Sequence, residues 1–234
     1  SGGNNTIYYG APGTGKSYTV DGQSKGDQVV RTVFHPDVQN SDFVGTLKPV
    51  REDDGITYRF SPGPFSLALA KAMNNPDRKV WLIIEELNRA PAASVFGDLF
   101  LLLDRDGNGR GEYDVNCPSE EFAHWYVEET GDSSDKIRLP SNLWIAATMN
   151  SADQGVFPLD TAFRRRWDQI YIPIDYNSGP SGSINFVPIG GPKTAIEWRK
   201  FVKALNDHLT AELSVAEDRL VGPWFVKDAE IGGE

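Results

Sequence analysis

The sequence predicts an α/β fold in which helices flank a parallel sheet of five strands. Short apolar runs rich in β-branched and aromatic residues alternate with stretches of helical character, which is typical of a sheet covered on both faces. A glycine-rich run separates the first strand from the first helix, and two later strands end in polar side chains. The predicted strands are Thr6–Tyr9, Gln28–Phe34, Val80–Ile84, Leu143–Thr148 and Gln169–Ile172. The predicted core helices are Gly15–Val20, Pro64–Met73, Ala92–Leu103 and Pro158–Arg166.

Three segments depart from this alternation. Between residues 36 and 62, the polar run Glu52-Asp53-Asp54-Gly55 predicts the turn of a hairpin. Residues 104–140 form a long acidic insertion, and loops of that length are usually functional or face a partner. The Gly/Ser/Pro-rich stretch 177–192 predicts a linker or insertion before a helix at Thr194–Leu213. We therefore expect a large α/β domain over residues 1–176, and a linker with part of a small helical lid over residues 177–234.

Composition narrows the class of protein. The formal net charge of −10 argues against this segment being the main reader of nucleic acid, because phosphate-binding domains usually carry a basic surface. No apolar run approaches the roughly 18 residues of a membrane span, so no membrane association is expected. The single cysteine, Cys117, cannot form an internal disulfide, which is consistent with a reducing cytoplasm.

The glycine-rich run fits the P-loop pattern at every fixed position, and it lies between a predicted strand and a predicted helix as that motif requires. Its glycines let backbone N–H groups wrap around phosphates, and the following helix adds its positive N-terminal end. The Lys16 ammonium is expected at the β- and γ-phosphates, and the Ser17 hydroxyl at Mg²⁺. The candidate nucleotide-binding residues are Gly10, Ala11, Pro12, Gly13, Thr14, Gly15, Lys16, Ser17 and the adjacent Tyr18.

Two carboxylates follow the apolar strand Val80–Ile84. A buried parallel strand delivers its last residues to the carboxyl edge of the sheet, where open α/β folds bind ligands. We assign Glu85 to the metal and Glu86 to the attacking water. The alternative is a solvated strand end, which the neighbouring P-loop makes less attractive.

A polar residue, Asn150, also ends the strand that begins at Leu143. Its carboxamide can hydrogen-bond both the γ-phosphate and the water. The later run Arg164-Arg165-Arg166 cannot point one way, because successive helical residues are about 100° apart. It is either a solvated basic face with a salt bridge to Asp160, or it supplies an arginine to a neighbouring subunit's γ-phosphate.

The order of these features resembles that of AAA+ NTPases, and more specifically the McrB family, the nucleotide-driven subunit of modification-dependent restriction systems. The likeness spans about residues 6–172. It rests on Glu85-Glu86-Leu87-Asn88-Arg89-Ala90, Val95-Phe96-Gly97-Asp98, Thr148-Met149-Asn150-Ser151-Ala152-Asp153 and Leu159-Asp160-Thr161-Ala162-Phe163-Arg164-Arg165-Arg166-Trp167. The tail 218–225 looks like that family's final lid segment.

The resemblance implies a hexameric ring with Mg²⁺-nucleotide at the subunit interfaces. It implies that Arg89 lies near the active site, that Asn150 is a sensor, and that Arg164 or Arg165 acts in trans. It further implies an McrC-type nuclease partner, and DNA binding through a domain outside this chain.

The sequence also departs from the family pattern. Gln154 follows Asp153 where GTP-using members tend to have Arg, and Glu85 stands where Asp is usual. The base is therefore open between GTP and ATP. Two other functions remain: an ATP-dependent protein remodeller of the MoxR group, and a nucleotide-dependent scaffold that barely hydrolyses.

Overall fold

The computed structural model describes residues 2–52, 55–151, 155–187, 191–227 and 230–231. Its contacts divide the chain into two compact units. Unit 1 comprises Ser1–Ile7, Gln23–Thr148 and Gly155–Gln169; unit 2 comprises Tyr8–Gly22, Met149–Gln154 and Ile170–Glu234. Each unit therefore joins segments that lie far apart in the sequence.

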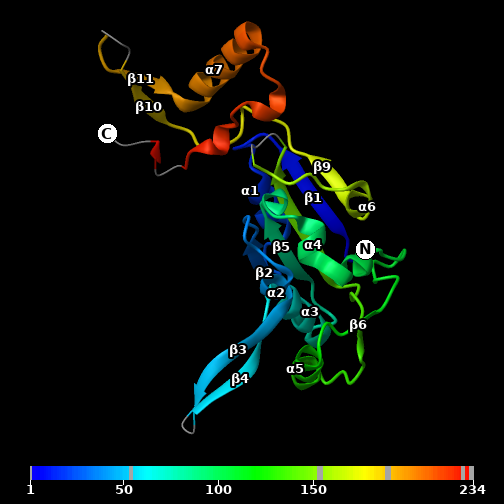
Figure 1. Ribbon diagram of the computed structural model, residues 1–234. Coiled ribbons are helices and arrows are strands. Elements are labelled where there is room, and N and C mark those ends of the chain that lie inside the picture. Colours follow the sequence, from blue (N-terminus) through cyan, green and yellow to red (C-terminus); the bar gives the residue numbers. More distant parts are fainter. Residues whose placement is uncertain (1, 53–54, 152–154, 188–190, 228–229, 232–234) are drawn as a thin grey trace. The chain divides into compact units, whose positions relative to one another are not determined.

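A five-stranded sheet has the strand order β2-β5-β8-β1-β9 (Figure 1). Its strands are β1 (Asn5–Gly10), β2 (Gln28–Val33), β5 (Val80–Glu85), β8 (Leu143–Asn150) and β9 (Asp168–Tyr171). β5 pairs in parallel with β2 on one side and with β8 on the other. The first five residues of β5 are all buried, as expected for a strand covered on both faces. The five predicted strands are confirmed, with ends that differ by one or two residues.

Two of the predicted core helices are confirmed. They are α1 (Lys16–Gln23), directly after the glycine-rich run, and α3 (Pro64–Asn74). α3 starts where the sequence predicts, because Pro64 occupies its first turn, where a missing N–H costs nothing. Its buried face includes Phe65 and Leu69.

The other two core helices are shorter than predicted. α4 covers only Ala92–Phe96, because Gly97 has a φ of 54° and ends the α-helix; the chain continues as the 3-10 helix η2 (Gly97–Leu103). α6 covers only Thr161–Arg164. It begins late because the Asp160 carboxylate accepts a hydrogen bond of 2.7 Å from the Phe163 N–H and caps the helix there.

Aromatic side chains fill the core of unit 1. The short helix α2 (Asn40–Val44), which the sequence did not predict, buries Phe43. The ring centroid of Phe43 lies 5.6 Å from that of Phe34, 5.7 Å from Phe65 and 4.8 Å from Phe96. Phe96 in turn packs against the fully buried Phe163 of α6 at 5.3 Å. These contacts anchor α2, α3, α4 and α6 to one another.

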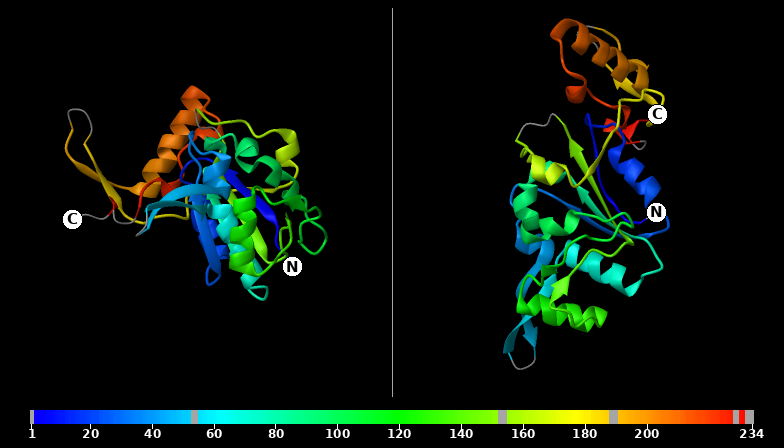
Figure 2. Two further views of the ribbon diagram at one scale, coloured as in Figure 1. Left: turned by 60° about the horizontal axis from the view of Figure 1, so that its bottom comes forward. Right: turned by 90° about the vertical axis from the view of Figure 1, so that its right-hand side faces the viewer.

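The predicted hairpin is confirmed, although Asp53 and Asp54 of its turn lie outside the described residues. β3 (Gly45–Glu52) and β4 (Gly55–Pro62) pair antiparallel, with Glu52 opposite Gly55. The acidic insertion 104–140 is more ordered than predicted, because it contains β6 (Val115–Asn116), α5 (Glu120–Thr130) and β7 (Lys136–Ile137). α5 lies beside the hairpin (Figures 1 and 2). Phe122 joins the two, because its ring centroid is 5.8 Å from that of Phe60.

Arg105 ties the start of this insertion to the sheet. Its guanidinium donates two hydrogen bonds to Asn5 Oδ1, at 3.0 and 3.1 Å. It donates three more to the carbonyl oxygens of Gly109, Pro140 and Leu143, at 2.9 to 3.3 Å. Burial lowers the pKa of Arg105 to about 10, which leaves it charged at neutral pH.

The C-terminal part of unit 2 contains a hairpin and a helix. β10 (Ser183–Phe186) pairs antiparallel with β11 (Thr194–Glu197), and α7 follows over Trp198–Leu213. Residues 177–192, expected to be a linker or an insertion, contain β10. The predicted helix Thr194–Leu213 begins four residues late, because Thr194–Glu197 pair with β10 instead. α7 is followed by the 3-10 helices η3 (Glu217–Arg219) and η4 (Pro223–Phe225). Among the residues that the structure describes, no helix is long and apolar enough to cross a membrane.

Candidate functional site

The P-loop joins β1 to α1 and belongs to unit 2. Gly13 and Gly15 adopt φ angles of 73° and 87°, which side chains of L-residues rarely permit. The Thr14 hydroxyl donates a hydrogen bond of 3.1 Å to the Ala11 carbonyl within the loop. The sequence thus specifies a closed backbone loop at the N-terminus of a helix.

Lys16 provides the positive charge of this loop. Its side chain is buried, and its Nζ donates hydrogen bonds to the carbonyl oxygens of Ala11 at 2.7 Å and Gly10 at 3.1 Å. The next residue, Ser17, is exposed at the start of α1. Tyr18 is also exposed, and its ring stacks on that of Trp224 at a centroid distance of 4.6 Å. A cation and an accessible hydroxyl therefore stand at one helix N-terminus, which is a favourable place for an anion.

The end of β8 lies next to the P-loop within unit 2. The N–H of Ser151 is 3.4 Å from the carbonyl oxygen of Gly10, and it donates a hydrogen bond to it. Asn150, immediately before Ser151, is half-buried. The structure thus places the backbone directly after the predicted sensor beside the first residue of the loop. Asp153 and Gln154, which carry the departure from the McrB pattern, lie outside the described residues.

The predicted metal ligand, Glu85, ends β5 in unit 1. Its carboxylate forms an ion pair with Arg31 of the neighbouring strand β2 through Oε1. Its Oε2 accepts a hydrogen bond from the Thr148 hydroxyl of β8 on the other side. The two neighbouring strands therefore fix the orientation of this carboxylate.

The predicted catalytic base, Glu86, has an unusual backbone. Its φ and ψ are 57° and 44°, in the left-handed region that non-glycine residues enter with strain and that is frequent at functional sites. Its N–H donates a hydrogen bond of 3.3 Å to the Thr148 hydroxyl. Its carboxylate is 35% exposed, and Oε2 lies 3.7 Å from Nε of Arg89. The strained turn thus presents an accessible carboxylate beside a cation.

The three consecutive arginines at the end of α6 and just after it have different surroundings. Arg166 is held within unit 1: its side chain is 6% exposed, and its Nη2 lies 2.7 Å from Asp104 Oδ2. The expected salt bridge to Asp160 is replaced by this pair, because the Asp160 carboxylate caps α6. Arg164 and Arg165 are exposed, and Arg164 donates a hydrogen bond of 2.8 Å to Gln169 Oε1. These two remain the ones available to a neighbouring molecule.

Comparison with known proteins agrees with these features. Residues 5–167 match the family described as AAA domain, dynein-related subfamily. The chain belongs to this AAA family.

Two relatives of this AAA chain are restriction-enzyme components. The BsuMI component YdiS of a type II restriction enzyme from Bacillus subtilis (strain 168) is 39% identical over 256 residues, which cover 97% of this chain and 74% of that protein. The EcoKMcrB subunit of a type IV methyl-directed restriction enzyme from Escherichia coli (strain K12) is 30% identical over 177 residues. That match covers 72% of this chain and 35% of the E. coli protein, so the chain spans about a third of that relative's length.

The AAA chain is therefore a McrB-like P-loop nucleoside-triphosphate hydrolase. Two residues that contact its acidic pair escaped the sequence analysis, namely Arg31 and Thr148. A signal for Arg31 was present, since it is the single charged residue in the strand sequence Gln-Val-Val-Arg-Thr-Val. Thr148 opens one of the blocks that resemble the McrB family, but its residue type did not single it out, because a buried threonine near a strand end is ordinary. Its role emerges only when β8 is placed beside β5.

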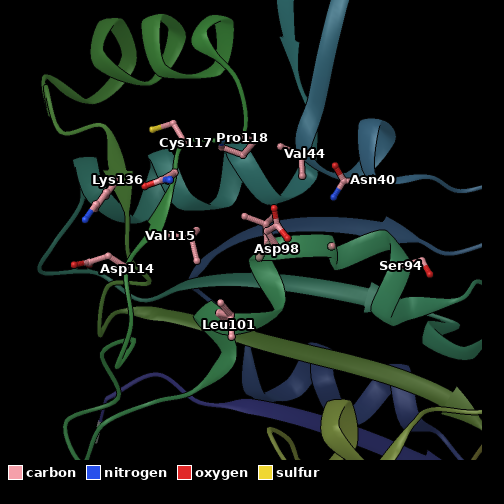
Figure 3. Close-up of a pocket in the computed structure, with 13 residues that line it drawn as sticks. Asn40, Val44, Ser94, Asp98, Leu101, Asp114, Val115, Cys117, Pro118 and Lys136 are labelled. Carbon is pink, nitrogen blue, oxygen red and sulfur yellow. The ribbon is translucent and has the colours of Figure 1, made fainter.

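A pocket of about 590 Å³ lies elsewhere in unit 1 of the AAA chain (Figure 3). Asn40 of α2, Asp98 and Leu101 of η2, and Val115 and Cys117 at β6 are among the residues that line it. None of the residues predicted to bind or hydrolyse nucleotide lines this pocket. It is therefore separate from the candidate site.

Proposed function

We propose that this AAA chain is the nucleotide-hydrolysing motor or switch subunit of a McrBC-like restriction system that defends against foreign DNA. The observation that carries the proposal is the combination of a P-loop, with Lys16 buried inside it, and a strained strand end that presents Glu86. The restriction-enzyme names of both relatives support the choice of system.

Each candidate residue has a definite part in this proposal. The P-loop N–H groups and the Lys16 ammonium bind the phosphates, and Tyr18 contacts the nucleotide at the start of α1. Glu86 accepts a proton from the attacking water, Arg89 holds the Glu86 carboxylate, and Asn150 orients the water. The left-handed backbone at Glu86 sets the direction in which its side chain leaves the end of β5.

Ser17 and Glu85 would hold Mg²⁺, which neutralises charge on the phosphates. The donors fit this ion, because Mg²⁺ prefers oxygen ligands and usually takes only one or two from the protein, the rest being phosphate and water. Arg31 and Thr148 each bind one oxygen of the Glu85 carboxylate and hold it at the end of β5. Whether the nucleotide is GTP or ATP is left for experiment to decide.

We further propose that the chain acts in a hexameric ring. Arg164 and Arg165 are exposed, so one of them can reach the γ-phosphate of a neighbouring subunit, where an arginine stabilises the transition state. An McrC-like nuclease would be the partner, and DNA would be bound by a domain outside this chain. The net charge of −10 supports that division of labour, because it disfavours DNA phosphates.

The first experiment measures binding of fluorescent ATP and GTP analogues with Mg²⁺, comparing wild type with Lys16→Ala. Binding by wild type and its loss in Lys16→Ala is expected, because the substitution removes the charge facing the β- and γ-phosphates. Glu86→Gln keeps the shape and removes the base, so it should bind nucleotide and lose turnover. Tight binding by Lys16→Ala, or full turnover by Glu86→Gln, contradicts the assignment. Stimulation by a protein substrate instead of by DNA or a nuclease would favour a remodeller.

A further inference from the structure

A C-terminal segment lies along the P-loop in unit 2. We name residues 220–225 the strap. The N–H of Gly222 donates a hydrogen bond of 2.8 Å to the carbonyl oxygen of Pro12, and the N–H of Trp224 donates one of 2.8 Å to the carbonyl oxygen of Gly13. The approach is so close that a Cβ at Gly222 would lie 2.2 Å from Gly13 O. Only glycine fits there.

Trp224 extends this contact to the first turn of α1. Its indole stacks on the Tyr18 ring, with an interplanar angle of 23°. The same indole would lie 3.0 Å from a Cβ placed on Gly15. The strap therefore contacts both the loop and the helix that follows it.

Helix α7 holds the strap from the other side. Asn206, 1% exposed, donates from Nδ2 to the carbonyl oxygen of Val221 at 2.7 Å, and its Oδ1 accepts the Val221 N–H at 3.1 Å. Nε1 of Trp198 donates to the carbonyl oxygen of Pro223 at 2.7 Å. Hydrogen bonds thus join α7 to the strap, and the strap to two carbonyls of the P-loop.

Because the peptide bond is planar, these contacts also determine the direction of neighbouring N–H groups in the P-loop. In a planar trans peptide, the C=O and the following N–H point in opposite directions, and the described residues contain no cis peptide. When the strap holds the carbonyls of Pro12 and Gly13, it therefore turns the N–H groups of Gly13 and Thr14 to the opposite side of the loop. Inward-facing N–H groups are what a P-loop uses to bind phosphate.

We propose that Asn206 and Trp198 are positioning residues, which act through the strap to orient two phosphate-binding N–H groups of the P-loop. The proposal rests on the nucleotide site described above. Because coupling between sites is reciprocal, bound nucleotide should in turn stabilise the strap on α7. The state of the P-loop is thereby linked to a helix about 190 residues later in the sequence.

The test compares Asn206→Leu with Val202→Ala in the full chain. Asn206→Leu preserves size and removes both hydrogen bonds to Val221, together with the one that Nδ2 donates to the Tyr176 hydroxyl at 2.9 Å. Val202→Ala weakens the buried face of the same helix and leaves these bonds in place. We expect Asn206→Leu to weaken binding of the fluorescent nucleotide about tenfold, the size of a typical coupling between sites. It should weaken competition by inorganic tripolyphosphate equally, because the affected N–H groups face phosphates and not the base. Val202→Ala should change neither value.

Four outcomes overturn the inference. If folded Asn206→Leu binds nucleotide as tightly as wild type, the strap does not position the loop. If both variants lose nucleotide affinity equally, the effect comes from a general destabilisation of α7. Absence of nucleotide binding in wild type removes the proposed function, and the inference with it. If Asn206→Leu does not fold, amide hydrogen exchange of wild type decides. Nucleotide should then slow exchange at Gly222 and Trp224, and unchanged exchange at both contradicts the proposal.

Discussion

The hydroxyl of Thr148 connects both residues of the acidic pair, and its removal is the sharpest test of the catalytic assignment. Thr148→Val keeps the shape of this buried side chain and removes one hydrogen bond to the Glu85 carboxylate and one from the Glu86 N–H. A hydrogen bond to a charged group contributes about 1.5–3 kcal/mol. The bond to Glu86, at 3.3 Å, is long and adds less. Since about 1.4 kcal/mol corresponds to a factor of ten, turnover should fall roughly tenfold to a hundredfold.

The assay is phosphate release at saturating Mg²⁺-nucleotide, with the same variants measured for nucleotide binding and thermal unfolding. Binding should change little, because Thr148 touches the acidic pair and not the P-loop. Thr148→Ser, which keeps the hydroxyl, should recover most of the turnover. Turnover within about twofold of wild type in Thr148→Val, or a serine variant as slow as the valine variant, would refute the reasoning.

Three further predictions concern stability and the ring. Arg105→Met should lower the free energy of unfolding by about 2–4 kcal/mol, because it leaves buried hydrogen-bond acceptors unpaired. Urea denaturation measures this free energy, and a loss below about 1 kcal/mol contradicts the prediction. Burial raises the pKa of Tyr126 to about 12, so its folded state prefers the protonated phenol. The contribution of Tyr126 to the free energy of unfolding is therefore present below pH 10 and lost as the pH rises from 10 through 12. This loss is at most about 2–3 kcal/mol, and it should be absent in Tyr126→Phe when unfolding is measured as a function of pH. Arg164→Ala or Arg165→Ala should spare nucleotide binding and lower turnover of assembled rings, and mixing with Glu86→Gln subunits should restore some of it; no rescue in mixed rings speaks for a role in cis.

Much of the fold was predictable because its signals are local in sequence. Five apolar runs specify the sheet, and a complete P-loop pattern specifies the turn between β1 and α1. The two helices whose extent was wrong depend on single residues. Gly97 ends α4, and the Asp160 side chain sets the start of α6. A periodic apolar pattern does not show such stops, because the buried face continues through them: Leu99, Leu102 and Leu103 are buried although they lie in a 3-10 helix.

The C-terminal error has a different cause. The residues of β11 precede a strongly amphipathic helix, and only pairing with β10, about ten residues earlier, makes them a strand. Strand pairing is a tertiary contact, and propensity within one window does not contain it. The same limit hid α5, which depends on Phe122 and Tyr126 finding buried positions.

The residues of the candidate site likewise fall into those found in local sequence motifs and those brought there by tertiary contacts. The groups that we propose to meet substrate directly, such as Lys16 and Glu86, lie in short motifs whose order carries the chemistry. The groups that we propose to position the site come from elsewhere, since Arg31 belongs to another strand and Asn206 to a helix about 190 residues after the P-loop. A positioning contact needs only a hydrogen bond of suitable geometry, which many residue types supply from many positions. A motif for such a contact therefore has no fixed spacing, and the structure is required to find it.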